Sequence, residues 1–253
     1  NGTGEYGDVI AWVMNRKKVD FKEAVTELAL KAGLPEPQWS RADQAVRLAA
    51  RVRADALTIA ARVFAGWFWG SPAAQEYAQK RGWTLARESD EGIDRDGGIA
   101  NRAMLGFSGR GTDQERIEMR DALISGGVDI NSPVAVSVLG FKGNVSSWAA
   151  GHGLTDLNED WILNGYIPGM VGRERLVYPH LESGRVVYLS ARSIVDKFHY
   201  NLPEVLAGKR QVYFNHEYAP GEQQVVVVEG QADALSLAQW DIPAVALAGV
   251  KLD

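Results

Sequence analysis

The sequence predicts a mixed α+β and α/β protein, in which a helical N-terminal part is followed by the start of an α/β domain with a parallel sheet. Up to about Gly169, apolar residues mostly recur every three or four positions, which is the period of a helix face. Beyond Gly169 they alternate with polar residues, as in strands. A strand–helix–strand pattern begins near Val225 and indicates parallel pairing of its two strands.

The first two predicted helices span Tyr6 to Met14 and Asp20 to Leu34. Asp20 is a suitable N-cap, and Glu23, three residues later, completes a capping box. Gly33 can close the second helix, and the PEPQ sequence that follows reads as a linker.

A long helical pattern, forming one helix or two, runs from Ala42 to Gly70. Ser71 and Pro72 then begin another helix, as its cap and its first turn. From Arg87 to Asn131 the chain is acidic, rich in glycine and less periodic, and we expect an exposed loop from Glu88 to Gly98.

Three stretches after Gly169 predict strands: RLVYPHL, RVVYLSARSI and QVVVVEG. The last leads through Glu229 and Gly230 into a helix, and Ile242 to Gly249 gives a second strand. Parallel strands of such a unit are expected to be buried on both faces, which would explain the unbroken valines. The carboxyl ends of parallel strands are where working residues lie, and Glu229 lies at such an end.

Glu229 and Asp233 are the candidate metal ligands. Gly230 permits a tight turn and a close approach of phosphate or metal to the backbone, and Asp233 can point back toward Glu229. A glutamate that ends a strand is more often a solvated turn residue, and an aspartate in a first helical turn is a common dipole partner. The spacing alone therefore favours the plain structural interpretation.

Several stretches, in the right order and over about half the chain, resemble bacterial DnaG-type primases. The strand, Glu229-Gly230 and the helix resemble the start of a toprim domain, the metal-dependent fold of these primases, of topoisomerases and of some nucleases. QEYAQKRGW ends a stretch similar to a primase helix pair that closes on Tyr-Leu-x-x-Arg-Gly, with Ala78 where leucine is usual. GRERLVYPHLESGRVVYLSARSI resembles the arginine-rich entry to the catalytic core, and YNLPEVLAGKRQVYF the segment before the toprim strand.

The resemblance implies three parts of the chain. Residues 1–36 correspond to a helical segment after a zinc ribbon, and residues 42–170 to a mostly helical subdomain with an insertion near residues 87–133. Residues 171–253 correspond to a basic strand region and the first part of the toprim domain.

Three departures from the family pattern stand out. Thr3 occupies the place of the ribbon's last cysteine, and the chain has no cysteine, so zinc is not expected here. The lysine expected before Tyr-Leu-Asn is replaced, with Lys197 or His199 as its stand-in. The second acidic cluster of a toprim site, Asp-x-Asp, is expected only beyond Asp253, as in a chain truncated within the domain. Residues 1–253 alone are therefore expected to show no nucleotidyl transfer.

The resemblance implies a primase that synthesises RNA primers on single-stranded DNA by metal-dependent nucleotidyl transfer. Glu229 would be the catalytic carboxylate and would bind Mg²⁺ or Mn²⁺ together with Asp233. The expected partners are a single-stranded DNA template, nucleoside triphosphates and a replicative helicase. Two alternatives stay open: a non-catalytic module that binds single strands or a replication partner, and a toprim nuclease.

The stretch before the final strand–helix–strand pattern is locally basic, and its side chains suit phosphate oxygens. Strand alternation could bring several of them onto one face. Without the resemblance, a solvated surface with ordinary ion pairs is the better interpretation. With it, we favour four residues as template or nucleotide contacts: Arg173, Arg175, Arg192 and Lys209.

Composition limits the class of protein. The net charge of −5 argues against a polybasic nucleic-acid coat but does not exclude a local basic groove. The chain has no apolar run of membrane-spanning length and no signal peptide, and a cytoplasmic protein is expected. The histidines (His152, His180, His199 and His216) show no metal-ligand spacing, and core packing is expected for Trp67, Trp69, Tyr178 and Tyr188.

Overall fold

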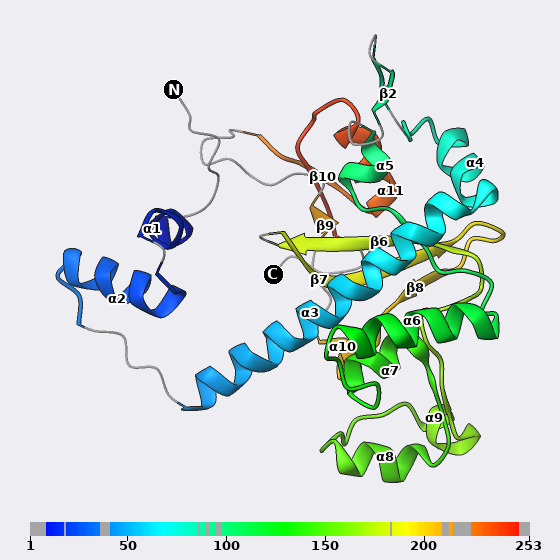
Figure 1. Ribbon diagram of the computed structural model, residues 1–253, viewed down its shortest axis with the longest axis horizontal. Coiled ribbons are helices and arrows are strands. Elements are labelled where there is room, and N and C mark those ends of the chain that lie inside the picture. Colours follow the sequence, from blue (N-terminus) through cyan, green and yellow to red (C-terminus); the bar gives the residue numbers. More distant parts are fainter. Residues whose placement is uncertain are drawn as a thin grey trace.

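The computed structural model describes residues 9–17, 19–35, 41–85, 87–89, 92–94, 98–182, 184–208, 213–214 and 224–247. Within these residues helices and strands are mixed, as predicted, with antiparallel sheets and one small parallel pairing (Figure 1). None of the helices in these ranges combines the length and hydropathy that crossing a bilayer requires.

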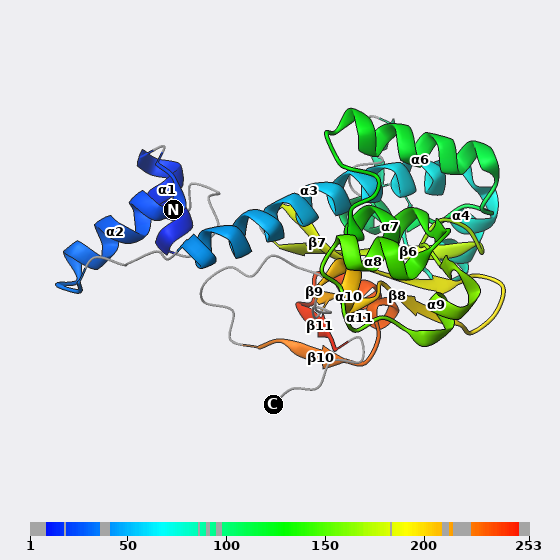
Figure 2. The same ribbon diagram turned by 90° about the horizontal axis from the view of Figure 1, so that it is seen from below.

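Four helices open the described chain: α1 (Val9–Lys17), α2 (Phe21–Lys31), α3 (Arg41–Gly70) and α4 (Pro72–Lys80). The predicted capping box of Asp20 and Glu23 is confirmed, and so are the Ser71 cap of α4 and its first-turn proline. The pattern from Ala42 to Gly70 forms a single helix. Figures 1 and 2 show α1 and α2 beyond the N-terminal end of α3, away from the sheets.

The middle of the chain contains β1 (Arg87–Ser89), β2 (Gly92–Asp94), α5 (Ile99–Arg102), β3 (Gly106–Phe107), α6 (Asp113–Ser125), α7 (Pro133–Leu139), β4 (Phe141–Lys142), α8 (Val145–Gly151), α9 (Glu159–Asn164) and β5 (Tyr166–Ile167). The expectation of a loop from Glu88 to Gly98 is wrong in part, because β1 and β2 pair as an antiparallel hairpin. The stretch predicted as an insertion also contributes to the core, since Met119 and Leu123 of α6 are fully buried.

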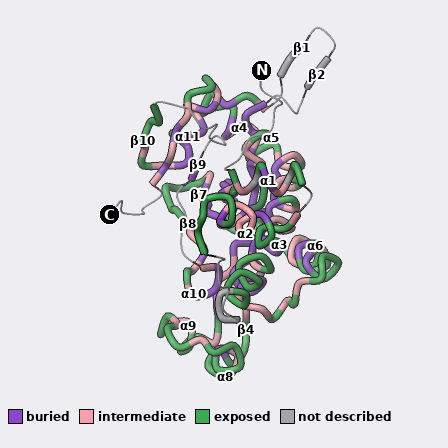
Figure 3. The backbone as a smooth tube through the Cα atoms, turned by 90° about the vertical axis from the view of Figure 1, so that its left-hand side faces the viewer, coloured by how far each residue is buried: buried purple, intermediate pink, exposed green. Residues whose placement is uncertain are grey.

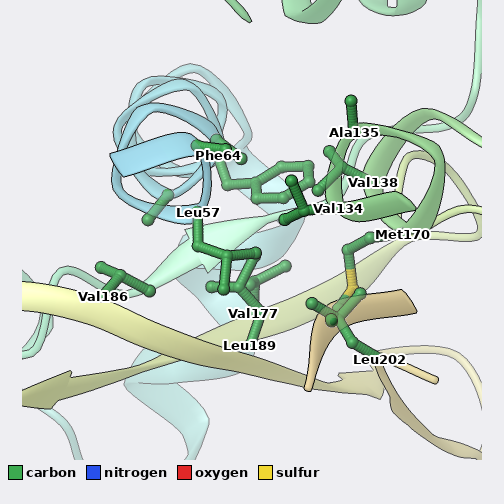
Figure 4. Packing of buried hydrophobic residues seen from close by; sticks show 14 of the residues in the cluster. Leu57, Phe64, Val134, Ala135, Val138, Met170, Val177, Val186, Leu189 and Leu202 are labelled. Atoms are coloured by element: carbon green, nitrogen blue, oxygen red, sulfur yellow. The ribbon is translucent and has the colours of Figure 1, made fainter. Parts of the chain in front are cut away.

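The central sheet has the order β3-β6-β7-β8 and contains β6 (Arg175–Glu182), β7 (Arg185–Ser193) and β8 (His199–Asn201), which precede α10 (Glu204–Ala207). One face, called here the α3 face, carries Val177, Leu189 and Ala191 and packs against Leu57 and Phe64 of α3 and against α7 (Figure 4). Thr58 of α3 accepts a hydrogen bond from the backbone N–H of Val186 at 3.0 Å, which fixes the helix on β7.

The opposite face of the sheet, called here the α11 face, carries Leu176 and Tyr178 and packs against α11 (Gln231–Ala238). This helix belongs to a small three-stranded sheet of order β10-β11-β9, made of β9 (Tyr213–Phe214), β10 (Val226–Val228) and β11 (Ala244–Ala246). The predicted strand–helix–strand unit is confirmed, since β10 and β11 pair in parallel.

The predicted burial of the valine strand is wrong. Val226 and Val227 are 42% and 54% exposed, and Figure 3 shows β10 as an exposed segment. Among the described strands, only β11 pairs with β10, so β10 lies at the edge of its sheet. This edge position explains why the valines are exposed. The unbroken valines thus mark a strand that is covered on one side only.

Candidate functional site

Glu229 and Asp233 lie where β10 passes into α11. Both side chains are exposed, Gly230 is the N-cap, and Asp233 lies in the first turn of the helix. A Cβ atom placed on Gly230 would lie 3.3 Å from Oδ2 of Asp233, so this carboxylate turns back toward the strand end. The structure thus places the Asp233 carboxylate beside Gly230, and its predicted approach to Glu229 stays a prediction.

The two carboxylates fit part of a magnesium or manganese site. None of the hydrogen bonds and ion pairs between described side chains involves either carboxylate. Mg²⁺ prefers oxygen ligands and keeps several waters, and one or two carboxylates are a usual protein contribution. Among the residues that the structure describes, no group of three or more acidic, histidine or cysteine side chains is placed to hold a metal.

Arg192 projects from β7 on the same side of the sheet as α11. It lies directly opposite Leu176 on β6 and His199 on β8, and side chains of directly paired residues share a face. Its Nε atom is buried and has no hydrogen-bond partner. The described residues therefore leave this donor without the partner that a buried polar group usually has.

The phenol of Tyr178 lies among the same charged groups. Burial raises its pKa; Tyr77 and Asp233 add to the increase, while Arg81 and Arg192 act against it. The Tyr178 hydroxyl is also buried without a hydrogen-bond partner. The charges of Arg192 on β7 and of Asp233 on α11 therefore both act on this buried hydroxyl.

Arg81 and His199 complete this region, and residue patterns alone did not select Arg81. Burial lowers the pKa of His199, and the positive charges of Arg192 and Arg81 lower it further. Arg81 follows α4 and donates to the Tyr77 hydroxyl from Nη2 at 3.0 Å. It is the arginine of the QEYAQKRGW stretch, so the motif that carried the family resemblance already contained the signal.

Arg175 does not share a surface with Arg192, contrary to the expectation of one basic face. It pairs with Ser193 rather than with Arg192, so its side chain projects from the α3 face. The side chain is 2% exposed, and its guanidinium lies 4.3 Å from the centre of the Tyr200 ring. Burial lowers the pKa of this guanidinium, and Nη1 has no hydrogen-bond partner.

Of the other two predicted phosphate contacts, the structure describes Arg173 but not Lys209. Arg173 is exposed and has a φ of 66°, next to Glu174 with a φ of 49°. Non-glycine residues rarely adopt this left-handed conformation, and runs of it concentrate at functional sites. Lys209 lies outside the described residues, as does His216.

The aromatic predictions are confirmed. Tyr178 and Tyr188 are buried, and Trp67 packs against both main core clusters while its indole N–H donates to Glu118 at 2.9 Å. Trp69 packs against the second of these clusters.

Comparison with known proteins gives no relative. The sequence matches no protein-family model, and no curated protein and no solved structure is similar to it.

Proposed function

We propose that this chain handles nucleotides and single-stranded DNA in metal-dependent nucleotidyl transfer of the toprim primase type. The proposal is carried by two exposed carboxylates at the start of α11, Glu229 and Asp233, and by Arg192 and Tyr178 on the sheet face that α11 covers. Nε of Arg192 and the hydroxyl of Tyr178 are buried and have no hydrogen-bond partner among the described residues. A metal–phosphate complex has both charges that such a site would bind. The order of the primase-like stretches in the sequence is the second support.

Each group has a distinct role in this proposal. Glu229 and Asp233 would hold Mg²⁺ or Mn²⁺, which when bound neutralises phosphate charge and favours ionisation of an attacking hydroxyl. Arg192 and Arg81 bind phosphate oxygens through guanidinium N–H groups, and the Tyr178 hydroxyl donates a further hydrogen bond. Arg173, exposed at the start of β6, contacts the backbone of the template strand.

A second candidate is a module that binds single-stranded DNA without chemistry. The observation in its favour is that two arginines, Arg192 and Arg81, supply positive charge around His199 without a metal. Phosphate contacts of this kind give affinity that is independent of base sequence.

Binding of a fluorescent ATP analogue, with and without Mn²⁺, tests the proposal. We expect Mn²⁺ to tighten binding in the wild type and to have no effect in Glu229→Gln. Arg192→Gln should weaken binding about tenfold with or without Mn²⁺, because a charge-assisted hydrogen bond is lost. The matched control is Arg102→Gln, which removes an arginine that pairs with Asp241 at 3.2 Å beyond the other end of α11.

The outcomes separate the candidates. Equal affinities for the Arg192 and Arg102 variants would overturn the proposed site. Binding that depends on Arg192 but not on Mn²⁺ or Glu229 would favour the non-catalytic module. Incubation with single-stranded template, nucleoside triphosphates and Mn²⁺ then distinguishes primer synthesis from strand cleavage, which is the product of a nuclease.

A further inference from the structure

Gln231 joins the start of α11 to the central sheet. Its side-chain amide donates to Oγ of Ser190 on β7 at 2.8 Å, and the same oxygen lies 2.9 Å from Nε2 of His180 on β6. All three side chains are buried. The three residues are called here the Gln231 anchor.

The Gln231 anchor reaches the part of the sheet that carries the cationic site. Ser190 lies directly opposite Tyr178 and two residues before Arg192, so all three project from the α11 face. The ring of His180 is held edge to face by Tyr188 and Tyr213, with ring centres 5.3 Å and 5.2 Å away. The sheet end of the anchor is therefore fixed by aromatic packing.

The other end of α11 is held separately. Gln239 accepts a hydrogen bond from the backbone N–H of Thr84 at 2.7 Å and donates to the carbonyl of Gly82. Ser236 accepts a hydrogen bond from the indole of Trp83 at 3.0 Å. Contacts near the C-terminal end thus fix the helix to the segment after α4, while at its first turn Gln231 supplies a side-chain hydrogen bond to the central sheet.

We propose that Gln231, Ser190 and His180 are positioning residues that hold the first turn of α11, with Glu229 and Asp233, against Arg192 and Tyr178. Without the Gln231 anchor, α11 stays attached at its C-terminal end and its first turn moves relative to β7. The consequence for metal and nucleotide rests on the proposed function, whereas the ordering of the first turn does not.

The test uses Gln231→Met, which keeps the side-chain volume and removes the amide, and Ser190→Ala, which leaves the amide and His180 without their shared partner. The control is Gln239→Met, which removes the corresponding amide at the other end of the same helix. Hydrogen exchange of the peptide spanning residues 230–236 reports the order of the first turn. Mn²⁺ affinity, from the paramagnetic resonance signal of the free ion, reports the carboxylates.

We expect exchange in residues 230–236 to become about tenfold faster in both anchor variants and to be unchanged in Gln239→Met. The double variant Gln231→Met/Ser190→Ala should be no faster than either single one, because both act through the same hydrogen bond. Mn²⁺ should bind about tenfold more weakly in the anchor variants, because loss of a residue that orients a metal ligand typically lowers metal affinity by this factor. In Gln239→Met the Mn²⁺ affinity should equal that of the wild type.

The results distinguish failure of the anchor from failure of the proposed function. Equal exchange in Gln231→Met and Gln239→Met, or additive effects of the two anchor substitutions, would overturn the positioning role. Faster exchange in the anchor variants together with no Mn²⁺ binding even in the wild type would support the ordering role and would refute the metal site.

Discussion

The two faces of the β6–β7 hairpin differ in what covers them. The α3 face is closed by a long helix and by α6 and α7, and its core residues Val177, Leu189 and Ala191 are buried and apolar. The α11 face also carries polar groups, among them Tyr178, Ser190 and Arg192. Arg175 and Arg192 belong to the same hairpin, but their side chains therefore have different surroundings.

This difference shows that local charge in a sequence does not locate a binding surface. Arg175 and Arg192 lie in paired strands but project to opposite sides, because side chains alternate along a strand. Arg175 is enclosed beside Tyr200, whereas Arg192 is only partly buried and lies near an exposed carboxylate. The proposed function is assigned to the α11 face because the carboxylates at the start of α11 lie on that side of the sheet.

The largest expected effect is on folding, from charge reversal at Arg175. Arg175→Glu should lower the free energy of unfolding by about 3–5 kcal/mol, because it leaves a buried carboxylate without a partner against the Tyr200 ring. Arg192→Glu should cost about 1 kcal/mol or less, since that side chain is only partly buried. Urea denaturation of the two variants checks this, and equal losses of stability would show that the two faces are covered alike.

The next comparison sets the α3 face against the edge strand β10. Leu57→Ala should cost about 3 kcal/mol, because it removes a fully buried side chain and leaves a cavity. Val227→Ala should cost less than about 0.5 kcal/mol, because the valine is more than half exposed. Thermal or urea unfolding measures both. A loss of more than 2 kcal/mol for Val227→Ala would mean that β10 is covered in solution.

Salt dependence of single-stranded DNA binding sharpens the contrast between the arginines. Arg192→Gln and Arg173→Gln should each lower the magnitude of the slope of log K against log salt by about 0.7, the value for one phosphate contact on a single strand. Arg175→Met should leave the slope unchanged, because its guanidinium is enclosed. A titration of affinity from low to high salt gives the slopes. A reduced slope for Arg175→Met would place template phosphates on the α3 face.

The smallest expected effect is a shift in one titration. His199 has a pKa below its ordinary value, first through burial and then through Arg192 and Arg81. Its contribution to stability is therefore full above an unfolded pKa of about 6.5 and is lost as the pH falls toward the folded-state pKa. Arg192→Gln should raise the pKa of His199, and added pyrophosphate should raise it in the wild type. Nuclear magnetic resonance of the imidazole measures both, with Arg102→Gln as the control, and a value that stays constant would remove His199 from the site.

Local structure was largely predictable from the sequence. The capping box of Asp20 and Glu23, the Ser71 cap and the parallel strand–helix–strand unit all depend on residues close in the chain. The helix α6 was missed, although Thr112 and Glu115 have capping-box spacing, because the glycine-rich sequence around it favoured a loop interpretation.

The sequence selected the carboxylates of the candidate site and Arg192, but not Arg81. Glu229 and Asp233 follow a recognisable strand end, whereas the arginines that act with Asp233 on Tyr178 come from other parts of the chain, Arg81 after α4 and Arg192 on β7. The enclosure of Arg175 depends on Tyr200, which β8 brings into place, and the exposure of β10 depends on which strands lie beside it. The periodicity of apolar residues predicts helices and strands, but it does not predict which of them pack against one another.

The contact between α3 and β7 has a consequence for synthesis of the protein. Thr58 and Val186 are joined by a hydrogen bond across 128 residues of chain. Translation adds about 5 to 20 residues per second, so β7 is synthesised roughly 6 to 26 seconds after the apolar stripe of α3. During that interval Leu57, Ala60 and Phe64 have no sheet to cover them, so this core can form only after β7 has been synthesised.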